Sequence, residues 1–374
     1  MMSDFNASVE MSALIGTDPM GFLAALGVLR LVTTELGWPA TLCWPAGPRN
    51  AAVLGGCPAG YTIEEVVDAI AGIVDATKSA GRLVPGVDGF PPWKPSNEKG
   101  DAVNELSLLD RIGLSVTANQ RPSPFAEWLV AILSLAAKDG ASAKAGKKPN
   151  GVEDSKRDDL EDKKVKRDAR NFTTAAFVTP TGTVSLGGRL DKGLASSDSG
   201  RIREALCGWV RTEGELGNYF DQRAIRDNYM GSSQKDTPNA GVPGAAWLAL
   251  MALPYLPVRT PLSGKAATVG FRRTRGKPTR MVWPVWSRPL TSETVGVLLD
   301  HPALTRIDDV PRDDKEAGHR SRTNARVLRA LSVSAVFSSD RRPGPQGPEG
   351  ALGPSVVLAP KPAPGRKGEH SESP

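Results

Sequence analysis

The stretch LIGTDPMGFLAALGVLRLV, Leu14 to Val32, is almost entirely apolar. Asp18 followed by Pro19 is typical of a helix start, because aspartate accepts hydrogen bonds from the first turn and proline has no amide hydrogen to leave unpaired. Gly21 and Gly27 would let another backbone approach closely. The pattern predicts a strand that leads into a core helix packed on several sides.

A secretory signal and a membrane span both fit this stretch poorly. A secretory signal begins with basic residues, whereas Asp4 and Glu10 precede the stretch and its first cation is Arg30. The apolar run from Met20 to Val32 is shorter than the roughly 20 residues that cross a bilayer. We therefore expect no membrane association. A phosphate-binding loop is also excluded, because no Gly-Lys-Ser/Thr follows.

The overall composition indicates a cytoplasmic protein. The 374 residues include Lys+Arg 47 and Asp+Glu 41, a net charge of +6, so the location of the positive charge matters more than its sum. Cys43, Cys57 and Cys207 have no zinc-site or redox-motif spacing, and such a sparse set favours a reducing compartment. We interpret each cysteine as a small core residue.

The hydrophobic patterns predict an α+β fold. The expected strands cover residues 5–14, 267–273 and 280–285, and residues 172–190 are expected to form strand and turn. The expected helices cover residues 62–77, 123–138, 199–211, 245–253 and 291–299.

Four segments follow from these patterns. Residues 1–140 form a helix-rich part with a few strands, and residues 171–340 form a mixed part with a basic β-hairpin. Residues 141–170 are highly charged and almost without large apolar side chains, which predicts a flexible insert. Residues 341–374 are rich in proline and glycine, which predicts a disordered tail.

Catalytic features are scarce. The chain has three histidines, and we find no motif of a nucleotide-binding, hydrolase or metalloprotease site. We interpret His301 as a helix-end or packing residue and His319 as part of a solvated charged loop. Asp221 and Arg223 are close in sequence and predict a loop held by ion pairs. We therefore expect no catalytic residue, no cofactor and no metal.

Two basic clusters point to phosphate contacts. The first lies in FRRTRGKPTR, residues 271–280, which contains no acid, and a hairpin tip would project its cations outward. The second lies on one face of an expected helix. Two interpretations of this face remain open: a solvated surface or a phosphate-binding surface. The candidate nucleic-acid-binding residues are Arg272, Arg273, Arg275, Lys277, Arg280, Arg322, Arg326 and Arg329. Trp283 and Trp286 follow the first cluster, and we interpret them as core residues rather than base-stacking platforms.

Three stretches together resemble a known family. They are LIGTDPMGFLAALGVLRLV, GAAWLALMALPYLPV (Gly244 to Val258) and TVGFRRTRGKPTRMVWPVWSRPLTSETVGVLL (Thr268 to Leu299). They are similar to stretches of large-subunit-like proteins in type I CRISPR effector complexes, in particular the I-G subtype, formerly I-U. These are motifs of fold and packing rather than of catalysis.

The resemblance implies a non-catalytic subunit of an RNA-guided surveillance complex. Its partners would be the other effector subunits, the guide RNA and the target DNA, and a separate helicase-nuclease would cut the DNA. In such systems base pairing reads the sequence while protein cations contact the backbone. Two alternatives stay open. One is a guide-RNA-processing endoribonuclease that uses His301, His319 or Tyr229. The other is a protein-interaction scaffold whose basic clusters serve solubility.

Overall fold

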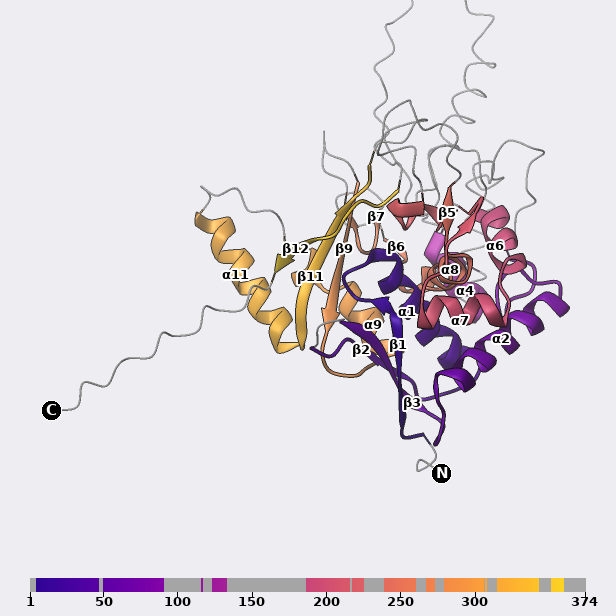
Figure 1. Cartoon of the computed structure of the whole chain (residues 1–374). Coiled ribbons are helices and arrows are strands. Elements are labelled where there is room, and N and C mark those ends of the chain that lie inside the picture. The colour runs from indigo at the N-terminus through magenta and orange to yellow at the C-terminus, as the bar shows by residue number, and fades with distance from the viewer. Residues whose placement is uncertain are drawn as a thin grey trace, which may run out of the picture.

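Helices and antiparallel sheets make up the described part of the chain, so the expected α+β class is confirmed (Figure 1). This is a computed structural model, and it describes residues 5–46, 50–90, 116, 123–132, 186–215, 217–224, 239–259, 267–272, 279–305, 307, 315–342 and 351–359. The charged segment 141–170 lies outside these ranges.

The first four-stranded sheet joins segments from both ends of the chain. Its strand order is β1 (Ala7–Ile15), β3 (Ala51–Cys57), β2 (Thr41–Cys43) and β10 (Leu290–Thr291). All three pairings are antiparallel. β1 confirms the strand expected before the apolar helix. Because β10 comes from the C-terminal part, the two parts expected from the sequence meet in one sheet.

The second four-stranded sheet contains both strands of the expected hairpin. Its order is β12 (Val356–Ala359), β11 (Val333–Asp340), β9 (Arg280–Trp286) and β8 (Phe271–Arg272). β8 and β9 pair antiparallel, and residues 273–278 between them lie outside the described part. β12 corrects the predicted disorder of the tail at residues 356–359. Its Val-Val-Leu run favours a strand despite the prolines and glycines around it.

Two pairs of very short strands complete the sheets of the described residues. They are β4 (Thr212–Glu213) with β5 (Ala240–Gly241), and β6 (Val258–Arg259) with β7 (Ala267–Thr268).

Most helices lie where the apolar spacing predicts them. They are α1 (Pro19–Thr34), α2 (Ile63–Ser79), α4 (Pro124–Ile132), α6 (Leu186–Ala195), α7 (Ser199–Cys207), α8 (Pro243–Met251), α9 (Ser292–Leu299), α10 (Pro302–Thr305) and α11 (Lys315–Ala330). Short 3-10 turns are η3 (Gly217–Tyr219), η4 (Gln222–Ala224) and η7 (Leu253–Tyr255). Within the described ranges, none of the helices has the length and apolar character needed to cross a membrane.

The sequence prediction was wrong for the start of α6. Strand and turn were expected through residue 190, whereas the helix begins at Leu186. Leu186, Leu190 and Leu194 are buried and lie four residues apart. Burial of this one helical face outweighs the helix-weakening glycines between them.

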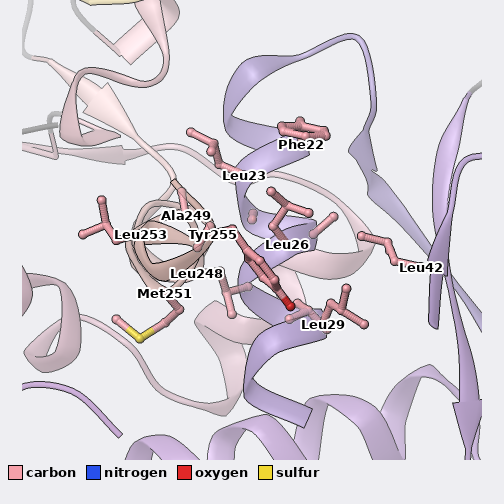
Figure 2. Close-up of a cluster of buried hydrophobic side chains, with 14 of the residues drawn as sticks. Phe22, Leu23, Leu26, Leu29, Leu42, Leu248, Ala249, Met251, Leu253 and Tyr255 are labelled. Carbon is pink, nitrogen blue, oxygen red and sulfur yellow. The ribbon is translucent and has the colours of Figure 1, made fainter. Parts of the chain in front are cut away.

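Helix α1 is the centre of the fold, as its sequence predicts. Asp18 Oδ1 accepts hydrogen bonds from the amides of Met20 (2.9 Å) and Gly21 (3.1 Å), which confirms the expected N-cap. Every residue of the helix from Pro19 to Val32 is buried. In Figure 2, Leu42 of β2 lies on one side of α1, and Leu248 of α8 lies on the other.

Glycines allow the central helices to touch backbone to backbone. A Cβ atom on Gly27 would lie 1.8 Å from the carbonyl oxygen of Leu248, so α1 and α8 are in direct contact. A Cβ atom on Gly244 of α8 would lie 2.2 Å from the carbonyl oxygen of Arg201 in α7. The close approach expected at Gly27 is therefore confirmed, and one hydrophobic core runs through both parts of the chain.

An aromatic cluster joins the two large sheets. Trp44 and Trp286 make a T-shaped contact with ring centroids 4.8 Å apart, and Phe22 of α1 packs against both rings and against Trp283. All of these tryptophans are buried, which confirms the core role expected for Trp283 and Trp286. The indole N–H groups of Trp44, Trp283 and Trp286 donate to the carbonyl oxygens of Leu14, Gly16 and Leu42, respectively.

The cysteines follow the sequence expectation in part. Cys43 and Cys57 are buried, and burial raises the pKa of the Cys57 thiol to about 11. Cys207 is exposed, so its expected core role was wrong. It is the last residue of α7, where the chain turns away from the core after Leu206.

Candidate nucleic-acid interface

Arg280 is bound at the root of the expected hairpin. It pairs directly with Arg272 across β8 and β9, an arrangement of like charges that is unfavourable unless each charge has a partner. The Nε of Arg280 lies 2.6 Å from Asp340 Oδ1, and its Nη2 lies 3.2 Å from Asp340 Oδ2. Asp340 is the β11 residue opposite Arg280. The guanidinium therefore links β9 to β11.

Arg272 is also engaged by the protein. Its Nη1 donates to the carbonyl oxygen of Ile307 at 2.8 Å, and its Nη2 donates to the carbonyl oxygen of Leu304. These carbonyls lie at the end of α10 and just beyond it, where the last carbonyl groups of a helix are open to donors from outside it. Arg272 thus ties β8 to α10. The other three cations of this cluster, at positions 273, 275 and 277, lie outside the described residues.

The second basic cluster lies on α11, at the edge of the molecule. Arg326 and Arg329 are exposed, and the side chain of Arg322 lies outside the described part. Leu328 is buried and anchors the helix, which packs against α10 and β11. In Figure 1, α11 lies to the left of the second sheet. The helices to the right of that sheet include α2, α6, α7 and α8. Since α10 contacts both Arg272 and α11, the two basic clusters adjoin the same short helix.

A cavity of about 310 Å³ opens at the foot of the β8–β9 pair. We call it the hairpin-foot cavity. Its apolar walls are Val269, Phe271, Val282, Leu299 and Leu304. Its polar lining is Arg259, Thr268, Arg272 and Asp300.

An ion pair crosses the lining of this cavity. Arg259 Nη2 lies 3.1 Å from Asp300 Oδ2, and both side chains remain partly exposed, at 59% and 41%. This pair could not be predicted, because Arg259 and Asp300 are distant in the chain and belong to no recognisable motif. Helix α9 packs against η7, which directly precedes β6 in the chain, and this contact brings the two segments together.

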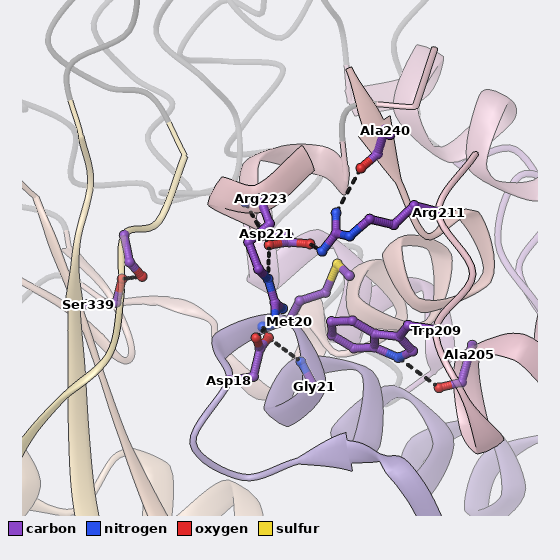
Figure 3. Close-up of polar contacts among 11 residues, drawn as sticks. Asp18, Met20, Gly21, Ala205, Trp209, Arg211, Asp221, Arg223, Ala240 and Ser339 are labelled. Atoms are coloured by element: carbon purple, nitrogen blue, oxygen red, sulfur yellow. Dashed lines mark hydrogen bonds and ion pairs between the residues drawn. The ribbon is translucent and has the colours of Figure 1, made fainter. Parts of the chain in front are cut away.

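A second polar cluster lies at the N-terminus of α1 (Figure 3). Asp221 has a side chain only 1% exposed and lies between two arginines. Arg211 Nη2 donates to its Oδ2 at 2.6 Å, and Arg223 Nε donates to its Oδ1 at 2.9 Å. Arg223 also binds Asp18, the cap of α1. The ion pair expected between Asp221 and Arg223 is confirmed, and the cluster stabilises the turns η3 and η4 against α1.

Asp18 makes the stability of this cluster depend on pH. Burial raises the pKa of its carboxyl above the usual 3.8, and Arg223 opposes that rise only in part. The folded state therefore binds the proton more tightly than the unfolded state. The contribution of Asp18 to the free energy of unfolding is largest below pH 3.8 and decreases as pH rises through the folded-state pKa.

We expect Asp18→Asn to remove this decrease. Asparagine keeps the N-cap hydrogen bonds but does not titrate. The measurement is urea unfolding of both proteins at a series of pH values that begins near 3.8, the ordinary pKa of aspartate, and rises from there. The variant should gain stability relative to the wild type as pH rises. A difference that does not change with pH would contradict the prediction.

Of the residues considered for an endoribonuclease, the structure describes the side chain of His301 alone. His301 Nδ1 accepts a hydrogen bond from the amide of Ala303 at 3.1 Å, and His301 lies just before α10. Its amide also donates to the carbonyl oxygen of Leu298 at 3.2 Å, so the expected position at the end of the helix that precedes it, α9, is confirmed. The side chain of His319 and the whole of Tyr229 lie outside the described residues. Among the residues that the structure describes, no group of three His, Cys, Asp or Glu could hold a metal ion.

Comparisons with known proteins give no family for this chain. No family model matches it, and no curated protein matches it at a significant level.

Proposed function

We propose that this chain is a non-catalytic, nucleic-acid-binding subunit of a CRISPR RNA-guided surveillance complex in antiviral defence. It acts in the cytoplasm beside the other effector subunits and contacts the backbone of guide RNA or target DNA. A separate helicase-nuclease cuts the DNA. The proposal rests on the resemblance of three sequence stretches and on the arrangement of basic residues around α10.

One observation carries the proposal. β8 and β9 are fixed in the sheet by the partners of Arg272 and Arg280, and the segment between them reads RTRGKP, with three cations and no acid. Since the two flanking arginines are used inside the protein, the three cations between them are the ones we assign to phosphate binding. Cations gathered in one short connection supply the salt-dependent attraction that nucleic acids require.

Helix α11 extends this basic surface. Arg326 and Arg329 are exposed, one turn apart, on a helix that also packs against α10. Phosphate contacts from neighbouring elements add to one another, because each releases counterions from the nucleic acid. The two clusters would therefore contact successive phosphates of one strand or duplex.

The first test is the salt dependence of nucleic-acid binding. We expect the triple variant Arg273→Ala, Arg275→Ala and Lys277→Ala to bind duplex DNA more weakly. The slope of log affinity against log salt should flatten by about 2.7, since each lost phosphate contact contributes roughly 0.9. Fluorescence anisotropy with a labelled duplex at several salt concentrations measures it.

A charge-conserving variant is the matched control. Arg273→Lys with Arg275→Lys keeps both positive charges, so it should retain nearly the wild-type slope. If the triple alanine variant kept the wild-type slope as well, the hairpin assignment would be refuted. Co-purification from the native operon tests the complex itself. A short uniform RNA arriving with several other proteins supports the proposal, and a chain that arrives alone without nucleic acid opposes it.

A further inference from the structure

We infer that the hairpin-foot cavity holds one unpaired nucleobase that carries an exocyclic amino group. This inference rests on the proposed function and deepens it, because it assigns base contacts to a surface otherwise assigned to phosphates. Three features of the described residues support it: the apolar walls, the partly exposed carboxylate of Asp300 and the place of Arg272 in the lining.

The walls suit the faces of a flat ring. The cavity is about 310 Å³, near the small end of the range of roughly 300–1,000 Å³ that is typical of ligand pockets. Phe271 supplies an aromatic ring, and the aliphatic side chains of Val269 and Leu304 complete the apolar surface. Stacking on such side chains is a common way for proteins to hold unpaired bases. Paired bases in a duplex could not enter, since both of their faces are already stacked.

The rim suits the edge of a base with a hydrogen-bond donor. Asp300 is the C-cap of α9, so its carboxylate adds to the negative end of the helix dipole. The pair with Arg259 uses Oδ2, and a carboxylate has acceptor sites beyond that one bond. Carboxylates accept from the amino group of cytosine, and adenine and guanine carry comparable amino groups. Thymine and uracil have none, so the cavity should discriminate against them.

The position of the cavity connects it to the phosphate contacts. Arg272 lines the cavity and is directly followed by the RTRGKP segment. A strand whose backbone binds those cations passes next to the cavity. Arg259, which lines the cavity next to Asp300, has a side chain that is 59% exposed, so it is available to a phosphate while it orients Asp300. Phosphate contacts of this kind position the strand, and the base contact adds selectivity.

The test compares the full-length chain on single-stranded homopolymers of deoxycytidine, deoxyadenosine and deoxythymidine of equal length. We expect binding to the first two to be about 10-fold tighter than to deoxythymidine, the size of one hydrogen bond to a charged group. Asp300→Asn should reduce this preference, because an amide can also donate to the thymine carbonyl. Val269→Phe should fill the cavity and abolish the preference, and Val130→Phe, at an exposed position of α4, is the control for added size.

The salt slope separates this inference from the proposed function. Neither Asp300→Asn nor Val269→Phe should change the salt slope. The triple alanine variant should flatten the slope and leave the base preference unchanged. Equal binding of all three homopolymers, or an unchanged preference in folded Val269→Phe, would overturn the base cavity and leave phosphate binding intact. If the wild type bound no nucleic acid, both proposals would fail together. Circular dichroism confirms that each variant is folded.

Discussion

Replacement of Gly27 by alanine is expected to destabilise the protein by about 3 kcal/mol, the upper part of the usual range for an overpacked core. The added Cβ would lie 1.8 Å from the carbonyl oxygen of Leu248 and 2.8 Å from its carbonyl carbon. Both atoms belong to backbone in the buried helix α8, so no side-chain rotation can relieve the clash. The two central helices would have to separate.

The measurement is chemical unfolding, with Gly72→Ala as the matched control. Gly72 lies in α2, and a Cβ atom there meets nothing within 4 Å. Alanine at that exposed helical position should stabilise the protein by roughly 0.5–1 kcal/mol through its better helix propensity. The same substitution is thus expected to have opposite signs in two helices. Equal effects at both positions would contradict direct contact between α1 and α8.

Replacement of Trp286 by alanine is expected to cost about 4 kcal/mol of unfolding free energy, as for other large aromatic residues truncated in cores. Trp286 lies in β9 of the second sheet and is fully buried. Its indole N–H donates to Leu42 of the first sheet at 2.6 Å, and its carbonyl oxygen accepts from the amide of Trp44 at 2.8 Å. The side chain therefore links the two sheets by packing and by a hydrogen bond.

A phenylalanine at position 286 separates these two contributions. It keeps most of the aromatic contact with Trp44 but leaves the carbonyl of Leu42 without its indole donor. The expected cost is about 1 kcal/mol, the usual net contribution of one buried hydrogen bond. Thermal unfolding of both variants measures the difference. A Trp286→Ala variant as stable as the wild type would refute the role of this residue in joining the sheets.

Much of the fold could be predicted because the deciding signals are local. Asp18 and Pro19 define the start of α1, and the apolar residues after them define its buried faces. Thr62 and Glu65 form a capping box that begins α2. The partner of Gly27 could not be predicted, since nothing local links it to Leu248. The strand β12 was missed because a four-residue apolar run is short beside the prolines and glycines that surround it.

The candidate interface was predictable in charge but not in geometry. The run of cations from Arg272 to Arg280 is visible in the sequence, yet only the fold reveals that its first and last members bind protein groups. The pairing of Asp340 with Arg280 depends on the register of β9 and β11. Likewise, the cavity that Arg259 and Asp300 help to line depends on segments that are brought together by packing. The charge of a segment follows from its composition, whereas the group that each charged side chain binds is determined by the fold.

The direct contact of α1 with α8 also has a consequence during synthesis. α1 is buried on all sides in the finished protein, but one of its main partners is translated much later. At roughly 5–20 residues per second, the ribosome reaches the end of α8 some 10 to 45 s after the end of α1. Throughout that interval the nascent chain carries an uncovered apolar helix. The protein should therefore depend on ribosome-associated chaperones, and its yield should decrease when they are depleted.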